Sequence, residues 1–209
     1  MSMTAIEFLI RMREHFARGL RHDDPEVRAE VRRVLDFLPP LENTPEPDIS
    51  KPAEEPKLLP AVRAFLKDNP DILGGGWLDL AERLHWRYSY EQRADDPDLD
   101  ARMGWYEFIG PAAPMHSDRV GFGITFARPG VNYRPHYHPA AEVYNTVIGS
   151  LTQRVGDREL TLVPGSFSYH RPNVIHSTRI GDAPVIQIYS WTGDVVTLSQ
   201  YADASGHRL

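Results

Sequence analysis

Cysteine is absent from the 209-residue chain, and long apolar runs are absent too. Without cysteine there is no disulfide framework, thiolate zinc site, iron–sulfur cluster or cysteine nucleophile, so any metal must be held by histidine, carboxylate or tyrosine. Apolar runs such as 8–10 are far shorter than the roughly 20 residues that a membrane span needs. Charged residues such as Arg11 and Glu14 interrupt any N-terminal signal-peptide pattern. We therefore expect a cytoplasmic protein with no membrane partner.

Basic charge is also in deficit. The chain has 23 Lys and Arg against 29 Asp and Glu, which gives a formal net charge of -6. Such a balance lacks the electrostatic footprint of a nucleic-acid-binding protein, so we expect no nucleic-acid partner. The hydrophobic share of 41% and the charged share of 25% are close to those of globular proteins and predict a folded core. The length is large for one minimal domain and small for two.

The N-terminal half shows a helical pattern. Residues 4–37 repeat apolar side chains at three- and four-residue spacing among charged ones, with the capping pattern Asp24-Pro25 near the middle. This period predicts two amphipathic helices, and residues 58–67 and 78–87 predict two more. We expect these four helices to cover the rest of the chain.

Proline is concentrated in residues 39–60, which hold seven of the eighteen prolines. A segment with this composition cannot continue as a helix or pair as a central strand, so it is predicted to be an extended connector. It is either a linker between domains or a strap lying on one domain, and the sequence alone does not choose.

From Gly104 the hydrophobic period changes from 3.6 to 2. Short apolar runs alternate with turns rich in Gly, Pro and Asp, at roughly the 8–12-residue spacing of a sandwich or barrel. The predicted strands lie within 120–126, 143–155, 159–163, 174–178, 184–191 and 195–198. We therefore predict a β-barrel over residues 104–209 and an N-terminal helical layer over 1–103, which includes the connector and packs on the barrel.

One stretch of the predicted barrel gathers metal-binding side chains. His136 and His138 lie two residues apart, Glu142 follows four residues later, and Tyr144 two beyond that. Residues two apart in an extended chain share a face, so all four side chains can point into a barrel. His176 follows a Pro-Gly turn and brings another imidazole on a neighbouring strand.

This set of side chains suits metal-assisted proton abstraction. Imidazoles and a carboxylate with open positions suit one divalent ion of Zn, Fe, Mn, Ni or Co. Such an ion polarises a substrate carboxylate and acidifies the proton on the adjacent carbon. A phenol with a pKa of about 10 is a poor base at neutral pH, but a nearby dication stabilises its phenolate. Either Tyr144 or Tyr133 can be the base, and the residues do not decide between them.

The spacing resembles that of a known superfamily. The first conserved cupin motif, G-x5-H-x-H-x3-E-x6-G, is matched throughout by Gly130, His136, His138, Glu142 and Gly149. Residues 164–176 resemble the second motif, although they lack its usual P-x-G-x2-H spacing. The resemblance covers about residues 119–192. It implies a mainly β fold, a double-stranded β-helix or jelly-roll barrel, preceded by about four helices.

Within that superfamily the chain is similar to the short Q-type dimethylsulfoniopropionate (DMSP) lyases of marine bacteria, in size and in its N-terminal helical layer. They share the run Y-x-x-H-x-H-x3-E-x-Y, with a further histidine 38 positions after the second one. Here the run comprises Tyr133, His136, His138, Glu142, Tyr144 and His176. The resemblance implies that His138, Glu142, His176 and Tyr144 surround the ion. It also implies that His136 and Tyr133 line the same pocket.

The resemblance further implies β-elimination of DMSP, a small zwitterionic carboxylate, to dimethyl sulfide and acrylate. Aromatic faces suit the sulfonium cation of this substrate. The candidates on or near the predicted strands are Trp105, Tyr106, Phe122, Tyr189 and Trp191.

Two other functions remain open for a metal cupin: an Fe(II) dioxygenase, and a non-catalytic small-molecule-binding protein. The oligomeric state is also open between monomer and homodimer. A pocket role for His170 is undecided from strand alternation. The remaining histidines are interpreted as structural, namely His15, His22, His85, His116 and His207.

Overall fold

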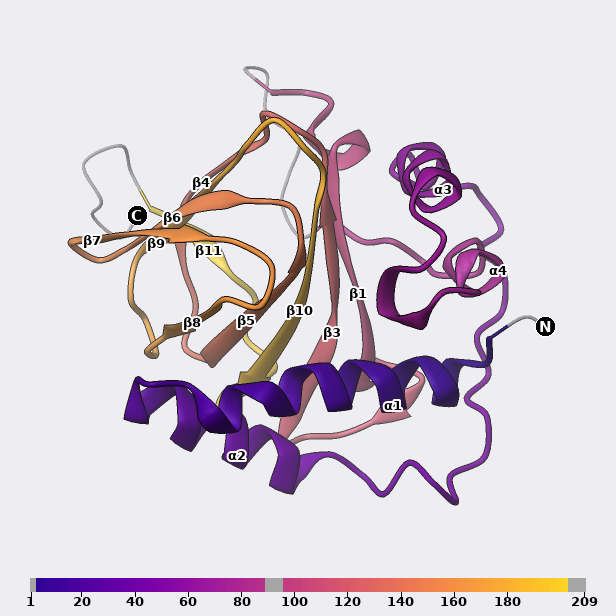
Figure 1. The fold of residues 1–209 in the computed structure, drawn as a ribbon, viewed down its shortest axis with the longest axis horizontal. Helices are drawn as coiled ribbons and strands as arrows, with labels where there is room; N and C mark the ends of the chain where they lie inside the picture. Colours follow the sequence, from indigo (N-terminus) through magenta and orange to yellow (C-terminus); the bar gives the residue numbers. More distant parts are fainter. Residues whose placement is uncertain (1–2, 89–95, 203–209) are drawn as a thin grey trace.

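The computed structural model describes residues 3–88 and 96–202, and two β-sheets with a layer of helices make up its architecture (Figure 1). The α-helices are α1 (Ala5–Phe16), α2 (Pro25–Phe37), α3 (Leu59–Asp68) and α4 (Leu78–Ala81). Short 3-10 helices lie at Ala17–Arg21, Ile72–Gly74 and Leu99–Ala101. The strands are β1 (Met103–Gly110), β2 (Met115–His116), β3 (Val120–Ala127), β4 (Asn132–Tyr137), β5 (Ala141–Ile148), β6 (Leu151–Val155), β7 (Arg158–Leu162), β8 (Phe167–His170), β9 (His176–Ile180), β10 (Val185–Thr192) and β11 (Gln200–Tyr201).

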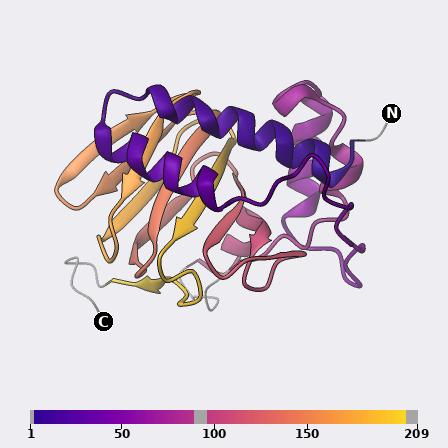
Figure 2. The same cartoon turned by 90° about the horizontal axis from the view of Figure 1, so that it is seen from below.

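The strands form a six-stranded sheet in the order β2-β1-β3-β10-β5-β8 and a five-stranded sheet in the order β11-β4-β9-β6-β7. Most neighbouring strands are antiparallel, and β1 with β2 is the parallel pair. Helices α1 and α2 lie side by side along one side of the barrel, as Figures 1 and 2 show, and α2 contacts β5, β8 and β10. The predicted class, mainly β with an N-terminal α layer, is confirmed.

The six-stranded sheet has two faces of different character. On β3, Phe122 and Ile124 are fully buried in one core with helix residues such as Phe16. The alternate residue Thr125 lines an internal cavity instead, as does Gln187 on β10. Because successive strand residues point to opposite faces, the same sheet supplies both the helix-facing core and one wall of the cavity.

Capping side chains define where the first two helices begin. Thr4 accepts a hydrogen bond from the Glu7 amide, and the Glu7 carboxylate accepts one from the Thr4 amide, which makes a capping box. The Asp24 carboxylate accepts from the Glu26 amide at 2.8 Å, and Pro25 occupies the first turn. The two predicted helices within 4–37 and the helix predicted over 58–67 are confirmed.

The helix predicted over 78–87 is too long. Helix α4 ends at Ala81, and Arg87 instead pairs with Trp105 of β1 through two backbone hydrogen bonds of 2.8 and 3.0 Å. Pairing with a sheet edge satisfies the same backbone groups that a longer helix would satisfy, so tertiary context decides the outcome.

The strand predicted over 195–198 is also wrong. The Asp194 carboxylate accepts hydrogen bonds from the amides of Val196 and Thr197 at 3.1 and 2.9 Å. This local turn takes the amides that a strand would need, and the last strand is instead β11.

The proline-rich connector lies along the helical layer. Residues 38–58 contain no helix or strand, yet Leu41 and Ile49 are buried in the same core as the helices. The Glu46 carboxylate accepts hydrogen bonds from the amides of Ala5 and Ile6, at 2.5 and 3.2 Å. It therefore neutralises part of the positive end of α1, and the connector is held as a strap on this layer.

Within the described residues, no helix combines the length and the apolar character that crossing a bilayer would require.

Two glycines with positive φ allow the cost of backbone strain to be distinguished from the cost of a steric clash. Gly149 (φ 82°) and Gly165 (φ 90°) both favour glycine, but a Cβ at Gly149 would lie 2.3 Å from the Pro184 carbonyl oxygen, whereas a Cβ at Gly165 meets nothing within 4 Å. Gly165→Ala should therefore lower the free energy of unfolding by about 1 kcal/mol through strain alone. Gly149→Ala should lower it by about 3 kcal/mol. Urea denaturation midpoints measure both losses, and equal losses would contradict this steric account.

Candidate metal centre and its cavity

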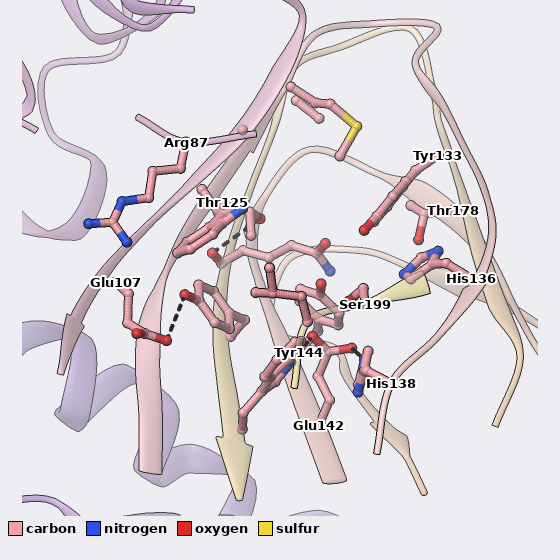
Figure 3. Close-up of a pocket in the computed structure, with 18 of the residues that line it drawn as sticks. Arg87, Glu107, Thr125, Tyr133, His136, His138, Glu142, Tyr144, Thr178 and Ser199 are labelled. Atoms are coloured by element: carbon pink, nitrogen blue, oxygen red, sulfur yellow. Dashed lines mark hydrogen bonds and ion pairs between the residues drawn. The ribbon is translucent and has the colours of Figure 1, made fainter. Parts of the chain in front are cut away.

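A cavity of about 250 Å³ lies between the two sheets, and Figure 3 shows the side chains that surround it. Its walls come mainly from β1, β3 and β10 on one side and from β4 and β9 on the other, with β5 at one end. Most of the residues singled out in the sequence line it: Trp105, Tyr133, His136, His138, Glu142, Tyr144, Tyr189 and Trp191.

Three buried side chains meet where two of them, His138 and Glu142, line one end of this cavity. His138, Glu142 and His176 each offer a ligand atom, and these atoms lie within 4.8 Å of one another. Oε2 of Glu142 lies 3.2 Å from Nε2 of His138 and 3.5 Å from Nε2 of His176. Within the described residues, Nε2 of His176 is buried and has no hydrogen-bond partner. Since an unpaired buried nitrogen is costly, this atom fits a metal ligand better than a structural imidazole.

A left-handed turn holds the two ligand segments together. Asn173 has a φ of 63°, a conformation in which asparagine replaces the more usual glycine. Its amide donates a hydrogen bond of 2.8 Å to the His138 carbonyl. The chain then enters β9 directly at His176. The turn at Asn173 thus places His176 close to the segment that carries His138.

His170, which strand alternation left undecided, belongs to this centre. It lies directly opposite Glu142 in the β5–β8 pairing, and its Nδ1 lies 2.9 Å from Oε2 of Glu142. Its Nε2 lies 3.0 Å from the side chain of Gln153. Burial, with the neighbouring His176, lowers the pKa of His170 to about 4, so the imidazole is neutral. The neutral ring donates one proton to the carboxylate and orients it.

Trp191 occupies the other oxygen of the same carboxylate. Its indole Nε1 donates to Oε1 of Glu142 at 2.7 Å, and its ring lies 4.4 Å from that of His138 at 31°. Burial alone would raise the pKa of Glu142, but the charge of His138 and the contacts of the carboxylate with His138, His170 and His176 hold it well below its usual value. Glu142 is therefore an ionised carboxylate with a fixed direction.

A β-bulge brings Tyr133 and His136 to the same cavity. They are three positions apart on β4, so strict alternation would place them on opposite faces. The partners across the ladder, Thr178 and His176, are only two residues apart, and the register shifts between the two pairs. The extra residue lies in a segment that contains Pro135, which is tolerated at bulges. Both side chains therefore line the cavity.

The two rings are stacked there, 3.9 Å apart at 23°. Nδ1 of His136 donates to the Arg134 carbonyl at 2.7 Å, and the ring lies 4.0 Å from that of His176. Burial and the neighbouring His176 lower the pKa of His136 well below its usual value, so this imidazole is neutral. His136 thus lies beside the group formed by His138, Glu142 and His176 and does not belong to it.

Tyr144 lies two residues after Glu142 on β5 and lines the cavity (Figure 3). Across the ladders it faces Tyr189 of β10 and Ser168 of β8. Its ring centroid lies 5.6 Å from that of His170. The phenol therefore stands on the same strand and the same face as the Glu142 ligand.

Two of the aromatic candidates lie elsewhere. Phe122 is fully buried against Phe16, with ring centroids 5.5 Å apart, in the core between helix and sheet. Tyr106 packs on Phe108 in the same core. Both are even-numbered residues on the helix-facing side of their strands, so their predicted place in the substrate pocket is wrong.

The cavity also contains a carboxyl group that belongs to no motif recognised in the sequence. Glu107 of β1 lines it and accepts a hydrogen bond of 3.4 Å from the Tyr189 hydroxyl. Burial raises the pKa of Glu107 to about 7, against smaller lowering effects of Tyr189 and Arg87. Burial and the charge of Glu107 raise the pKa of Tyr189 well above its usual value, so its hydroxyl stays protonated and donates.

Four of the five histidines interpreted as structural make hydrogen bonds away from the cavity. Their partners are Asn145 for His15, the Asp24 amide for His22, the Ser50 carbonyl for His85 and the Pro111 carbonyl for His116. His207 lies outside the described residues.

Comparisons with known proteins agree with this geometry. The sequence profile of the dimethylsulfoniopropionate lyase family matches residues 75–187. Dimethylsulfoniopropionate lyase DddQ of Ruegeria pomeroyi is 26% identical over 155 residues, which are 70% of this chain and 76% of that protein. The putative dimethylsulfoniopropionate lyase DddL of Cereibacter sphaeroides is 30% identical over 123 residues, 58% of this chain. The match spans about half the length of DddL, at 51%.

The crystal structure of DddQ from Ruegeria pomeroyi superposes on this chain with a TM-score of 0.65 at 23% identity. The superposition covers 95% of this chain and 98% of the other, so the likeness includes the helical layer as well as the barrel. The predicted cupin barrel with an N-terminal helical layer is thereby confirmed.

The raised pKa of Glu107 predicts a pH-dependent stability. The folded-state pKa of about 7 exceeds the ordinary value of 4.5, so wild-type stability should be lost as pH rises from about 4.5 to 7, because only the unfolded state ionises freely there. Glu107→Gln removes this titration. The free energy of unfolding of Glu107→Gln minus that of wild type should increase by about 1–3 kcal/mol between pH 4.5 and pH 8. Urea denaturation across this range measures the difference. Glu159→Gln makes the same change at an exposed site and serves as the control. A difference between Glu107→Gln and wild type that does not change with pH would refute the shift.

Proposed function

This chain belongs to the dimethylsulfoniopropionate (DMSP) lyase family of carbon–sulfur lyases, and we propose that it cleaves DMSP to dimethyl sulfide and acrylate. The observation that carries the proposal is the meeting of His138, Glu142 and His176 at one end of a cavity that Tyr144 and Tyr133 also line. The substrate is a small zwitterionic carboxylate. Monomer or homodimer, and a cytoplasmic location, remain predictions from the sequence.

We propose that His138, Glu142 and His176 hold one divalent ion of Zn, Fe, Mn, Ni or Co, with Tyr144 as a further ligand. Neutral imidazoles and a carboxylate suit each of these metals. The unpaired Nε2 of His176 supports this assignment. When bound, the ion supplies positive charge that attracts a carboxylate and acidifies the proton on the adjacent carbon.

The neighbours of Glu142 keep the ligand group oriented. His170 and Trp191 hold its two oxygens at 2.9 and 2.7 Å. Partners of this kind commonly fix ligand direction and raise metal affinity. Trp191 therefore serves the carboxylate as well as lining the substrate cavity, where its ring covers the His138 imidazole.

Tyr144 is the base that we propose, and Tyr133 is the alternative. Tyr144 shares the cavity face of β5 with Glu142, which is two residues away. Tyr133 stands on the opposite sheet, stacked on His136. Tyr189 is unsuited, because its raised pKa keeps the phenol protonated.

The elimination balances without a redox cofactor. The proton on the carbon next to the substrate carboxylate moves to the tyrosine oxygen, and its electron pair forms the carbon–carbon double bond of acrylate. The bond from the next carbon to sulfur breaks, and its electron pair leaves on neutral dimethyl sulfide. The tyrosine proton then passes to solvent. A base placed in this way contributes about 10²–10⁴-fold in rate.

Metal removal is the first test. Stripping the protein with a chelator should abolish dimethyl sulfide release from DMSP, measured by headspace gas chromatography, and adding back one of the five metals should restore it. His176→Ala should lower the metal content found by elemental analysis, whereas His116→Ala, outside the cavity, should keep it. Unchanged turnover by the stripped protein would contradict the metal proposal, and oxygen consumption without dimethyl sulfide would indicate a dioxygenase.

Tyrosine variants test the base. Tyr144→Phe should lower kcat by about 10²–10⁴-fold, because the proton acceptor is lost. Tyr133→Phe should lower it less. Tyr169→Phe, which makes the same change on the helix-facing side of β8, should keep wild-type turnover. Circular dichroism checks the fold of each variant. A large loss in Tyr133→Phe with little loss in Tyr144→Phe would assign the base to Tyr133 instead.

A further inference from the structure

The backbone around Glu107 is shaped to hold its carboxylate. A Cβ on Gly110 would lie 2.0 Å from Oε1 of Glu107, and a Cβ on Gly121 would lie 2.7 Å from Oε2. Any other residue at either position would displace the carboxylate. The ring of Tyr189 is accommodated in the same way, since a Cβ on Gly123 would lie 2.6 Å from it. Two neighbouring strands thus leave space for one acidic and one phenolic side chain.

The negative charge of Glu107 has few partners for a carboxylate that is largely buried. Across residues 3–88 and 96–202 it forms no ion pair, and its hydrogen bond from the Tyr189 hydroxyl is long at 3.4 Å. Among the described residues, Arg87 is the arginine that lines the cavity; its guanidinium lies 5.6 Å from the centre of the Trp105 ring, and its charge lowers the pKa of Glu107 by less than burial raises it. Figure 3 shows this guanidinium pointing away from the histidine end of the cavity. A cationic ligand would supply the charge that Glu107 lacks.

Aromatic surface completes this end of the cavity. Trp105 precedes Glu107 by two residues and shares its face of β1. The rings of Trp105 and Tyr189 are 6.3 Å apart and nearly perpendicular at 85°, so they form a corner beside the carboxylate. An onium group with no N–H bond donates no conventional hydrogen bond. Ring faces and a nearby negative charge are therefore its principal sources of attraction.

The acidic and histidine-rich ends are opposed. Figure 3 shows Glu107 on one side of the cavity and His138, with His136 beyond it, on the other. A zwitterion whose carboxylate is held at the metal-binding end places its cation toward Glu107. The cavity thus offers two separated poles for a substrate that carries two separated charges.

We propose that Glu107, Trp105 and Tyr189 form a cation subsite for the sulfonium group of the substrate, with Glu107 selecting for positive charge. This inference rests on the function proposed above and deepens it. The positive charge on sulfur disappears as the carbon–sulfur bond breaks, so attraction to Glu107 favours the bound substrate over the transition state. Glu107 therefore determines affinity and specificity, and it accelerates no chemical step.

A pair of ligands that differ in charge alone provides the test. 3-(Trimethylammonio)propanoate and 4,4-dimethylpentanoate have nearly the same shape, but only the first carries a cation. Their dissociation constants are measured by calorimetry on the metal-loaded full chain at pH 8, above the pKa of Glu107 of about 7. Wild type should bind the cationic ligand roughly tenfold or more tightly than the neutral one. Glu107→Gln should bring the two affinities close together, while the exposed control Glu159→Gln should keep the wild-type ratio.

Kinetics on DMSP give a second readout. Glu107→Gln should raise KM roughly tenfold without lowering kcat, as expected when an attraction that is stronger in the bound substrate than in the transition state is lost. A wild-type ratio near one, a wild-type ratio retained in Glu107→Gln, or a loss confined to kcat would each overturn the subsite. Glu107→Asp keeps the negative charge but moves it back by one methylene group. It should therefore give a ratio of cationic to neutral ligand affinity between those of wild type and Glu107→Gln. This ratio serves as the readout if Glu107→Gln does not fold.

The two proposals fail separately. If metal-loaded wild type released no dimethyl sulfide, the lyase function would be lost, but the ligand pair would still report whether Glu107 selects for a cation. If wild type turned over DMSP and Glu107→Gln kept its charge preference, the subsite alone would be wrong.

Discussion

The whole site depends on the contacts of the Glu142 carboxylate. One of its oxygens meets the imidazoles of His138 and His170, and the other accepts from Trp191. These partners come from the end of β4, from β8 and from β10, so one buried group links segments of both sheets. A buried carboxylate without such partners would take up a proton. Because the ring nitrogens and the indole surround it, Glu142 stays ionised and fixed in direction, which a metal ligand requires.

The helical layer makes this polar interior possible. The six-stranded sheet turns residues such as Phe122 and Ile188 toward α1 and α2, where they are fully buried. Each large apolar side chain buried in this way contributes about 1.5–3 kcal/mol. The hydrophobic stabilisation of the fold is thus concentrated outside the barrel. The opposite face of the same strands is free to carry carboxyl, imidazole and phenol groups, several of which oppose folding.

Motif spacing predicted the group formed by His138, Glu142 and His176, although Glu142 on β5 and His176 on β9 belong to different sheets. It did not predict His170, whose role follows from lying opposite Glu142 across a ladder. Glu107 escaped notice because a single acidic residue on a strand resembles any exposed one. Its environment comes from glycines on its own and the adjacent strand.

The errors in the fold have similar causes. Phe122 was assigned to the pocket on its aromatic character, whereas strand parity assigns it to the core. Helix α4 ended early because pairing of Arg87 with Trp105 of β1 competed with local helix propensity. Local pattern therefore predicted the helices and several strands, but its strand ranges missed β1 and β8. Contacts between distant segments determined where the elements end and which way they face.

The bulge in β4 has a consequence for how this chain is aligned with other barrels. The tyrosine and the first histidine of the stretch face the same interior only because one strand has a residue that its partner lacks. A sequence alignment can place a gap between Tyr133 and His136 wherever residue identities match best. Such an alignment would pair Tyr133 with a tyrosine that points outward in a strand without the bulge. The count of intervening residues, odd or even, therefore carries information that residue identity does not. A survey for barrels with this arrangement should search for the spacing as well as the letters.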